Sequence, residues 1–192
     1  MSTDFTIDFE SMGLFQDSVL LSLGVTIFDS DEGTNDEIFD DAVERGLHVK
    51  FGVKPQLKSG RKMEADTVEW WKTQTSASAK KILTPSPLHD KSLKEGVEQL
   101  HTYLKANGFN KDSNMWGRGY VEPMWYFSIC KEFGIDPLIN YWQFRDARTY
   151  IMLEMHPEKF VRTVKPKNFV HHDALHDSAF LILQMIDPMG QK

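Results

Sequence analysis

The stretch FTIDFESMG, residues 5–13, decides how the rest of the chain is interpreted. Its Phe and Ile residues are typical of a buried β-strand, yet it carries two carboxylates, Asp8 and Glu10, one residue apart. On a strand, residues i and i+2 point to the same face. Two like charges on a buried face are costly unless something compensates them. A metal cation, basic partners or exposure of the strand end would each do so, and the segment alone leaves these three open.

Size and composition indicate a globular protein with a single domain over residues 1–192. The longest apolar run, at 19–28, is too short to cross a bilayer, so we expect no membrane association. The N-terminus lacks a secretory signal pattern, and the lone Cys130 is typical of a cytoplasmic protein. The net charge of −6 argues against nucleic-acid binding through a broad basic surface. It is compatible with an acidic enzyme site that metal ions neutralise.

The order of the hydrophobic patterns predicts an α/β fold. Strand patterns at 5–10, 17–29 and 46–53 are joined by short connections, which favour antiparallel pairing. Short strands are also expected within 113–119 and 140–144, and the acidic stretch 29–41 is expected to be a solvated loop. Helical patterns are expected over the following stretches: 64–83, 92–109, 122–135, 146–155 and 172–186.

Tryptophan is expected to pack mainly in the core. Trp70 and Trp71 are adjacent on a helical pattern, so at most one of them can face the core directly. The other three, Trp116, Trp125 and Trp142, are predicted to be core residues.

A second chemical signal lies near the C-terminus, in FVHHDALHDSAFLILQM, residues 169–185. His172 and Asp177 are separated by four residues at the start of an apolar helical pattern. Taken alone, the segment is better explained as a polar helix start with partly exposed His side chains.

The two signals together are more specific. DFE near the N-terminus and HDALHD near the C-terminus resemble the first and last motifs, D-x-E and H-x4-D, of the DEDDh family of 3′–5′ exonucleases. The segments 68–83, 116–119 and 142–149 also resemble the phage exonuclease A subgroup of that family. The resemblance implies a ribonuclease-H-like fold, in which a mixed sheet of three antiparallel N-terminal strands plus parallel strands is flanked by helices.

The resemblance also implies an activity. Such an enzyme removes nucleoside monophosphates one at a time from the 3′ ends of single-stranded DNA or RNA, using two Mg²⁺ or Mn²⁺ ions. The subgroup implies a phage origin and action in the host cytoplasm. Hard cations of this kind prefer carboxylate oxygens, which fits the opening pair of acids.

Site residues follow from the motifs that match. Asp8, Glu10 and Asp177 would be metal ligands, and His172 would take the proton from the attacking water, because an imidazole pKa lies near working pH. The family places small apolar residues after its first motif against the terminal base, and the matching positions are Met12 and Gly13. Arg118 would contact substrate phosphate, although simple solvation explains it as well.

The middle motif departs from the family pattern. The family carries an Asp near the start of the helix after the fourth strand, whereas this chain has WGRGYVEPMW at 116–125. Glu122 is the acidic residue in that place and is predicted to be the fourth metal ligand. Asp146, in FRDART, is the other possible supplier.

Two rival classes remain open from the sequence. The two His-Asp doublets of HHDALHD are compatible with an HD-type phosphohydrolase in which His172 and His176 share a metal. Such a protein is all-helical, which the strand patterns oppose. The altered middle motif is compatible with a catalytically degenerate relative that binds nucleic acid or protein.

Overall fold

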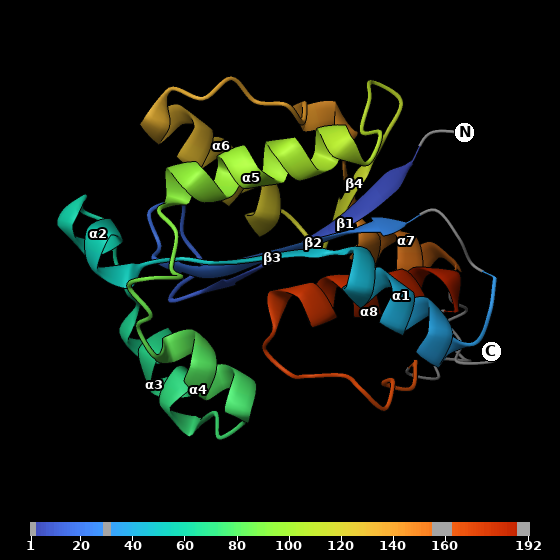
Figure 1. Ribbon diagram of the computed structural model, residues 1–192, viewed down its shortest axis with the longest axis horizontal. Coiled ribbons are helices and arrows are strands. Elements are labelled where there is room, and N and C mark those ends of the chain that lie inside the picture. Colours follow the sequence, from blue (N-terminus) through green and yellow to red (C-terminus); the bar gives the residue numbers. More distant parts are fainter. Residues whose placement is uncertain (1–2, 29–31, 155–162, 188–192) are drawn as a thin grey trace.

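The computed structural model describes residues 3–28, 32–154 and 163–187, and it combines a central sheet with helices on both of its faces (Figure 1). In the described residues, no helix is long and apolar enough to cross a membrane. The elements, in chain order, are β1 Asp4–Ser11, β2 Leu20–Phe28, α1 Asn35–Arg45, β3 Leu47–Lys50, α2 Val53–Lys58, α3 Ala65–Thr73, α4 Ala77–Leu83, α5 Leu93–Ala106, β4 Met115–Gly117, α6 Val121–Phe133, the 3₁₀ helix Tyr141–Gln143, β5 Phe144–Asp146, α7 Ala147–Glu154 and α8 Ala174–Ile186.

The sheet has the strand order β3-β2-β1-β4-β5. β2 pairs antiparallel with both β1 and β3, whereas β4 is parallel to β1 and β5 is parallel to β4. The predicted mixed sheet, with three antiparallel N-terminal strands followed by parallel ones, is therefore confirmed. The carboxyl ends of β1, β4 and β5 meet at one edge, which is where functional side chains gather in such sheets.

Helices α5 and α6 cover one face of the sheet (Figure 1). Phe5, Ile7 and Phe9 of β1 point to this face and are at most 6% exposed. The apolar stripe of α5 packs against them, with Leu93, Val97, Leu100 and Leu104 all buried. Ser92 caps α5, because its side chain accepts a hydrogen bond from the Glu95 amide.

Helices α1, α7 and α8 cover the opposite face (Figure 1). α8 approaches the sheet closely at Gly24 of β2, where a Cβ atom would lie 2.1 Å from the Ala174 backbone. Any side chain at this position would push the N-terminal end of α8 away from β1. Gly24 therefore fixes how near the last motif comes to the first.

The expectation of a loop over 29–41 is wrong for its second half. Residues 29–31 lie outside the described part of the chain, but Asn35 begins helix α1. Thr34 and Glu37 form a reciprocal capping box, and Ile38 and Phe39 turn into the core. The high acidic content hid this T-x-x-E helix start, whose first-turn carboxylates are favoured by the helix dipole.

The tryptophan predictions are partly confirmed. Trp71 and Trp125 are buried, and Trp70 is 44% exposed, so only one of the adjacent pair faces the core. Trp116 is half-buried and donates to the Asp4 carboxylate. The prediction for Trp142 is wrong, because it is 56% exposed; it belongs to a single 3₁₀ turn before β5, which turns its ring outward.

Candidate active site

Asp8 and Glu10 lie on the face of β1 that α8 covers. They sit opposite two small residues of β2, since Asp8 pairs with Gly24 and Glu10 pairs with Ser22. The register shifts directly after Glu10, between Glu10 and Ser11. Such irregularities re-aim side chains and end strand pairing, and they are common beside active sites. The two carboxylates therefore share a face, as the sequence predicts, at the end of the strand.

Asp177 joins them from α8. Asp173 caps this helix by accepting from the amides of Leu175 and His176, so Asp177 occupies the first turn. The Ser178 hydroxyl anchors the helix to the sheet by donating to the Gly24 carbonyl at 2.9 Å. In this arrangement Asp8, Glu10 and Asp177 each offer a carboxylate oxygen, and these oxygens lie within 4.8 Å of one another.

The cluster is electrostatically unfavourable without a cation. Burial, followed by repulsion from Glu10 and Asp177, raises the pKa of Asp8 well above its usual value. Burial and the Asp177 and Asp173 carboxylates raise the pKa of Glu10 to about 8, and burial raises that of Asp177. Three carboxylates that resist ionisation together are stabilised by a bound divalent cation, because the cation favours their charged forms.

His172 stands directly before α8 in a strained backbone conformation. Its φ of +59° is the single positive value of a non-glycine residue in the part of the chain that the structure describes. Its ring contacts Trp70 and Trp71 edge-on, with centroids 5.0 and 5.6 Å away, and Ser78 donates to its carbonyl. Partial burial lowers the pKa of His172, although the Asp177 carboxylate opposes the shift. The imidazole is thus held neutral and oriented at neutral pH.

The two candidate middle-motif acids have opposite environments. Glu122, in the first turn of α6, is 3% exposed, and its Oε2 has no hydrogen-bond partner within the described residues. This oxygen lies 3.1 Å from where a Cβ would stand on Gly117, at the end of β4. Asp146 is exposed, and it caps α7 by accepting from the Arg148 amide and the Thr149 hydroxyl. Glu122 is therefore the acid with a buried, unused ligand atom.

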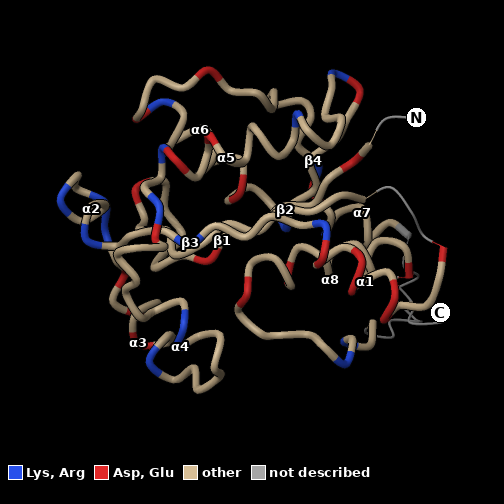
Figure 2. The backbone as a smooth tube through the Cα atoms, in the orientation of Figure 1, with Lys and Arg blue, Asp and Glu red and all other residues tan. Residues whose placement is uncertain are grey.

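Arg118 brings positive charge to this acidic site. It follows β4, is half-buried, and its Nη2 donates to Gln184 of α8 at 2.9 Å. It is close enough to oppose the raised pKa values of Asp8, Glu10 and Glu122. Elsewhere, basic positions gather around α2, and the remaining basic and acidic positions are interspersed along the backbone (Figure 2).

The two residues predicted to meet the terminal base are both buried. Met12 is 8% exposed and packs in a cluster with Trp71, and Gly13 is also buried. The exposed apolar side chains are those of the next two residues, Leu14 at 59% and Phe15 at 67%. The contact of Trp70 and Trp71 with His172 was likewise absent from the sequence prediction, and no local sequence signal reveals it.

The structure opposes the HD-type alternative. A five-stranded sheet contradicts an all-helical fold. His176 also turns away from His172, because its Nδ1 accepts from the Val170 amide and its ring packs on Phe39.

Comparison with known proteins supports one family. A family described as the Rv2179c-like 3′-5′ exoribonuclease domain matches residues 3–183. An exodeoxyribonuclease of Enterobacteria phage T4 is 32% identical over 202 residues, which covers 95% of this chain and 87% of that protein.

Solved structures support the fold. The nuclease domain of 3′hExo, a DEDDh family member bound to rAMP, superposes with a TM-score of 0.56 at 9% identity, covering 100% of this chain and 95% of that one. E. coli Exonuclease I in complex with a dA16 oligonucleotide gives 0.61 at 13% identity, with this chain spanning 41% of its length. These matches agree with the mixed sheet. The chain belongs to the Rv2179c-like 3′-5′ exoribonuclease domain family, and it is a 3′–5′ exonuclease of the DEDDh type.

Proposed function

We propose that residues 1–192 form a single exonuclease domain that shortens single-stranded nucleic acid from the 3′ end by a two-metal-ion mechanism, releasing nucleoside monophosphates. The observation that carries the proposal is the cluster of Asp8, Glu10 and Asp177, with carboxylate oxygens within 4.8 Å of one another. Carboxylates crowded in this way, with raised pKa values, are matched by hard divalent cations.

Three of the predicted ligands are grouped closely enough to hold a divalent cation, and a pair of Mg²⁺ or Mn²⁺ ions would need Glu122 as well. Asp8, Glu10 and Asp177 would hold them together with Glu122, whose buried Oε2 lacks a hydrogen-bond partner among the described residues. Glu122 is near enough to Asp8 for its charge to add slightly to the raised pKa of Asp8. When bound, paired ions of this kind activate a water and stabilise the charge of the attacking and leaving oxygens.

The protein's own groups supply the remaining steps. His172 accepts the proton of the attacking water at a ring nitrogen, which its lowered pKa keeps free at neutral pH. Trp70 and Trp71 hold the imidazole by edge contacts. Arg118 is placed to attract the substrate phosphate, because its guanidinium lies beside the acidic cluster.

The segment after β1 is suited to bind the 3′-terminal nucleotide without recognising which base it carries. Leu14 offers the terminal base an exposed apolar side chain, next to the buried Met12 and Gly13 in the sequence. Stacking of this kind tolerates any base. The T4 relative is named for DNA and the family for RNA, so both remain candidate substrates. A phage relative favours action in the cytoplasm of a bacterial host.

Single-stranded oligonucleotides labelled at the 5′ end test the proposal. Deoxy and ribo versions of one sequence, incubated with Mg²⁺ or Mn²⁺, are expected to give a ladder that shortens from the 3′ end. An Asp177→Asn variant purified in parallel controls for contaminating nucleases. Internal cuts, or activity that survives full chelation, would overturn the proposal.

A further inference from the structure

A loop of residues 13–18 joins β1 to β2 at the edge of the site. Hydrogen bonds from its backbone hold it: Phe15 donates to the Ser18 hydroxyl at 3.0 Å, and the Phe15 carbonyl accepts from Trp125 of α6 at 2.9 Å. The Leu14 amide donates to Glu64. The side chains of Leu14 and Phe15 remain largely exposed. The loop therefore presents apolar side chains outward while its polar backbone is bound to the protein.

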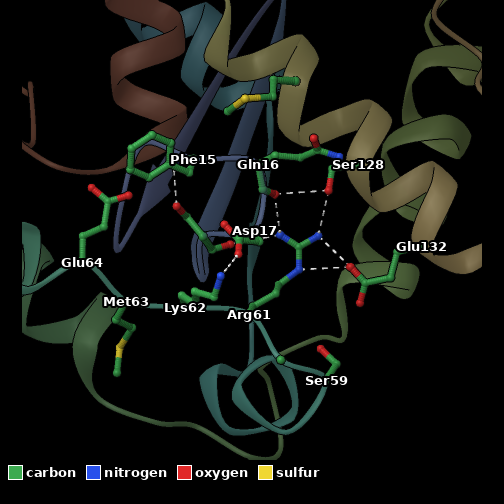
Figure 3. A pocket seen from close by; sticks show the side chains of 13 residues that line it. Phe15, Gln16, Asp17, Ser59, Arg61, Lys62, Met63, Glu64, Ser128 and Glu132 are labelled. Atoms are coloured by element: carbon green, nitrogen blue, oxygen red, sulfur yellow. Dashed lines mark hydrogen bonds and ion pairs between the residues drawn. The ribbon is translucent and has the colours of Figure 1, made fainter.

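Arg61 is the central partner of this loop. Its side chain is 4% exposed, and its Nη1 donates to the carbonyls of Ser18 at 3.0 Å and Gln16 at 3.4 Å. Its Nε and Nη2 donate to a single oxygen of Glu132 on α6, at 3.1 and 2.8 Å. Ser128 of α6 accepts from Nη2 and donates to the Gln16 carbonyl. Figure 3 shows this guanidinium joining the loop to the helix.

Few side chains pack beneath the loop, so hydrogen bonds contribute much of what holds it in place. A cleft of about 850 Å³ opens between the loop, the segment 59–64 and α6, with Met63 and Met124 among its lining residues. Leu14 and Phe15 gain little support from burial. The position of the loop therefore depends mainly on hydrogen bonds. These are the bonds to Arg61, Trp125 and Glu64, together with the one from the Lys62 amide to the Asp17 carbonyl at 2.8 Å.

The set of acceptors around position 61 matches the donors of an arginine side chain. A buried charge is tolerated only when it is paired and its donors are satisfied. The planar guanidinium can serve a carboxylate and two carbonyls at once, whereas a lysine ammonium is a single point charge. Lys62, the neighbouring cation, provides a contrast, since its ion pair with Asp17 is largely solvent-exposed.

We propose that Arg61 is a positioning residue for the substrate strand. By fixing the carbonyls of residues 16 and 18 to α6, it holds the 13–18 loop where Leu14 and Phe15 meet the nucleotides at the 3′ end. This inference rests on the proposed function, because it assigns the loop to substrate. Among the described residues, Arg61 makes no hydrogen bond or ion pair with the acidic cluster or with His172, so its loss affects binding more than the chemical step.

Kinetics of Arg61→Gln and Arg61→Lys on a single-stranded oligonucleotide test the proposal. We expect the KM to rise by about 10- to 100-fold, the order expected when a base-stacking contact is lost, with kcat largely kept because only binding is weakened. Arg61→Lys is expected to restore part of the loss. Hydrogen exchange is expected to speed up at the amides of residues 13–18 and to stay unchanged in α8.

Lys62→Gln is the matched control, because it removes an adjacent cation that also pairs with the loop but at the surface. Its KM is expected to equal that of the wild-type protein. Should Arg61→Gln fail to fold, Arg61→Lys and Ser128→Ala carry the test, since Ser128→Ala removes a smaller part of the same network. An unchanged KM in the folded variants, a loss of kcat alone, or an equal rise in Lys62→Gln would overturn the inference. If the wild-type protein does not shorten oligonucleotides, the proposed function fails instead, and hydrogen exchange still reports whether Arg61 holds the loop.

Discussion

The two faces of β1 have opposite chemistry. Phe5, Ile7 and Phe9 pack under α5 and α6 and are almost fully buried. On the alternate face, Asp8 and Glu10 meet a third carboxylate from α8. Burial of the first face stabilises the folded state by about 25 cal/mol for each Å² of apolar surface. The second face destabilises the folded state while no cation is bound, because burial and mutual repulsion disfavour the charged carboxylates and raise their pKa values.

The difference shows how one strand separates stability from activity. Alternation in a strand sends successive residues to opposite faces, so a side chain can be optimised for the core without disturbing its neighbour. Gly24 and Ser22 leave room beside the acids, while Leu23 and Val25 of the same strand fill the core. Substitutions on the two faces are therefore expected to have separable effects.

The largest effect is expected for Asp8→Asn. It removes a charge from the centre of the cluster, and we expect nuclease activity to fall by more than about 10⁴-fold, since a catalytic ion contributes several kcal/mol. In chelator, the melting temperature is expected to stay the same or rise, because the repulsion is relieved. The oligonucleotide ladder and a thermal melt measure the two quantities. A clear loss of metal-free stability would contradict the idea that this face is unfavourable.

His172→Ala comes next. Removal of the base is expected to slow hydrolysis by roughly 10²–10⁴-fold, the usual contribution of general acid–base catalysis. Titration calorimetry with Mn²⁺ is expected to show binding close to that of the wild-type protein, because no ligand role is assigned to this residue. Abolished Mn²⁺ binding would mean that His172 belongs to the metal site.

Ile7→Ala tests the opposite face. Truncation of this fully buried side chain is expected to cost about 2–5 kcal/mol of unfolding free energy. Activity per folded molecule is expected to be retained, because the Asp8 face is not altered. Urea denaturation measures the first quantity, and Leu88→Ala, at an 89% exposed position, is the control expected to change stability little. Loss of activity in fully folded Ile7→Ala would show that the faces are coupled.

Most of the fold was predictable because hydrophobic periodicity reports which face of an element is buried. The strand at 5–10 and the Leu93–Leu104 stripe are examples in which every apolar position is a core position. Helix α1 was missed because its apolar positions are few and its acids suggested a loop. Motif spacing placed Asp8, Glu10 and Asp177 in one cluster. The contacts of His172 with Trp70 and Trp71 could not be predicted, because they depend on how a distant loop and helix α3 meet.

Stability without metal is expected to depend on pH through the acidic face. The pKa of Glu10 lies at about 8 in the folded protein, against 4.5 ordinarily. Between these values the native state binds more protons than the unfolded state, so stability falls as pH rises. We expect the melting temperature in chelator to be lower at pH 8 than at pH 5 by several degrees, given about 2–4 °C for each kcal/mol. Saturating Mg²⁺ and the variant Glu10→Gln are each expected to flatten this dependence, and a melting temperature that rises with pH in chelator would contradict it.

The smallest effect is expected for Asp146→Asn, which asks whether an acid at the same edge of the sheet matters when it is exposed. Asp146 ends β5 and caps α7 through its two carboxylate oxygens. Because Asn caps helices about as well as Asp, stability is expected to change by less than about 0.5 kcal/mol and nuclease activity to stay the same.

The matched variant is Glu122→Gln, which keeps side-chain size while removing the charge of a buried acid. It is expected to lower the rate by orders of magnitude with little change in melting temperature, because a ligand charge is lost while packing is preserved. If Asp146→Asn is inactive and Glu122→Gln is active, the fourth metal ligand is Asp146. Burial of the side chain would then not distinguish a catalytic acid from a helix-capping acid at this edge of the sheet.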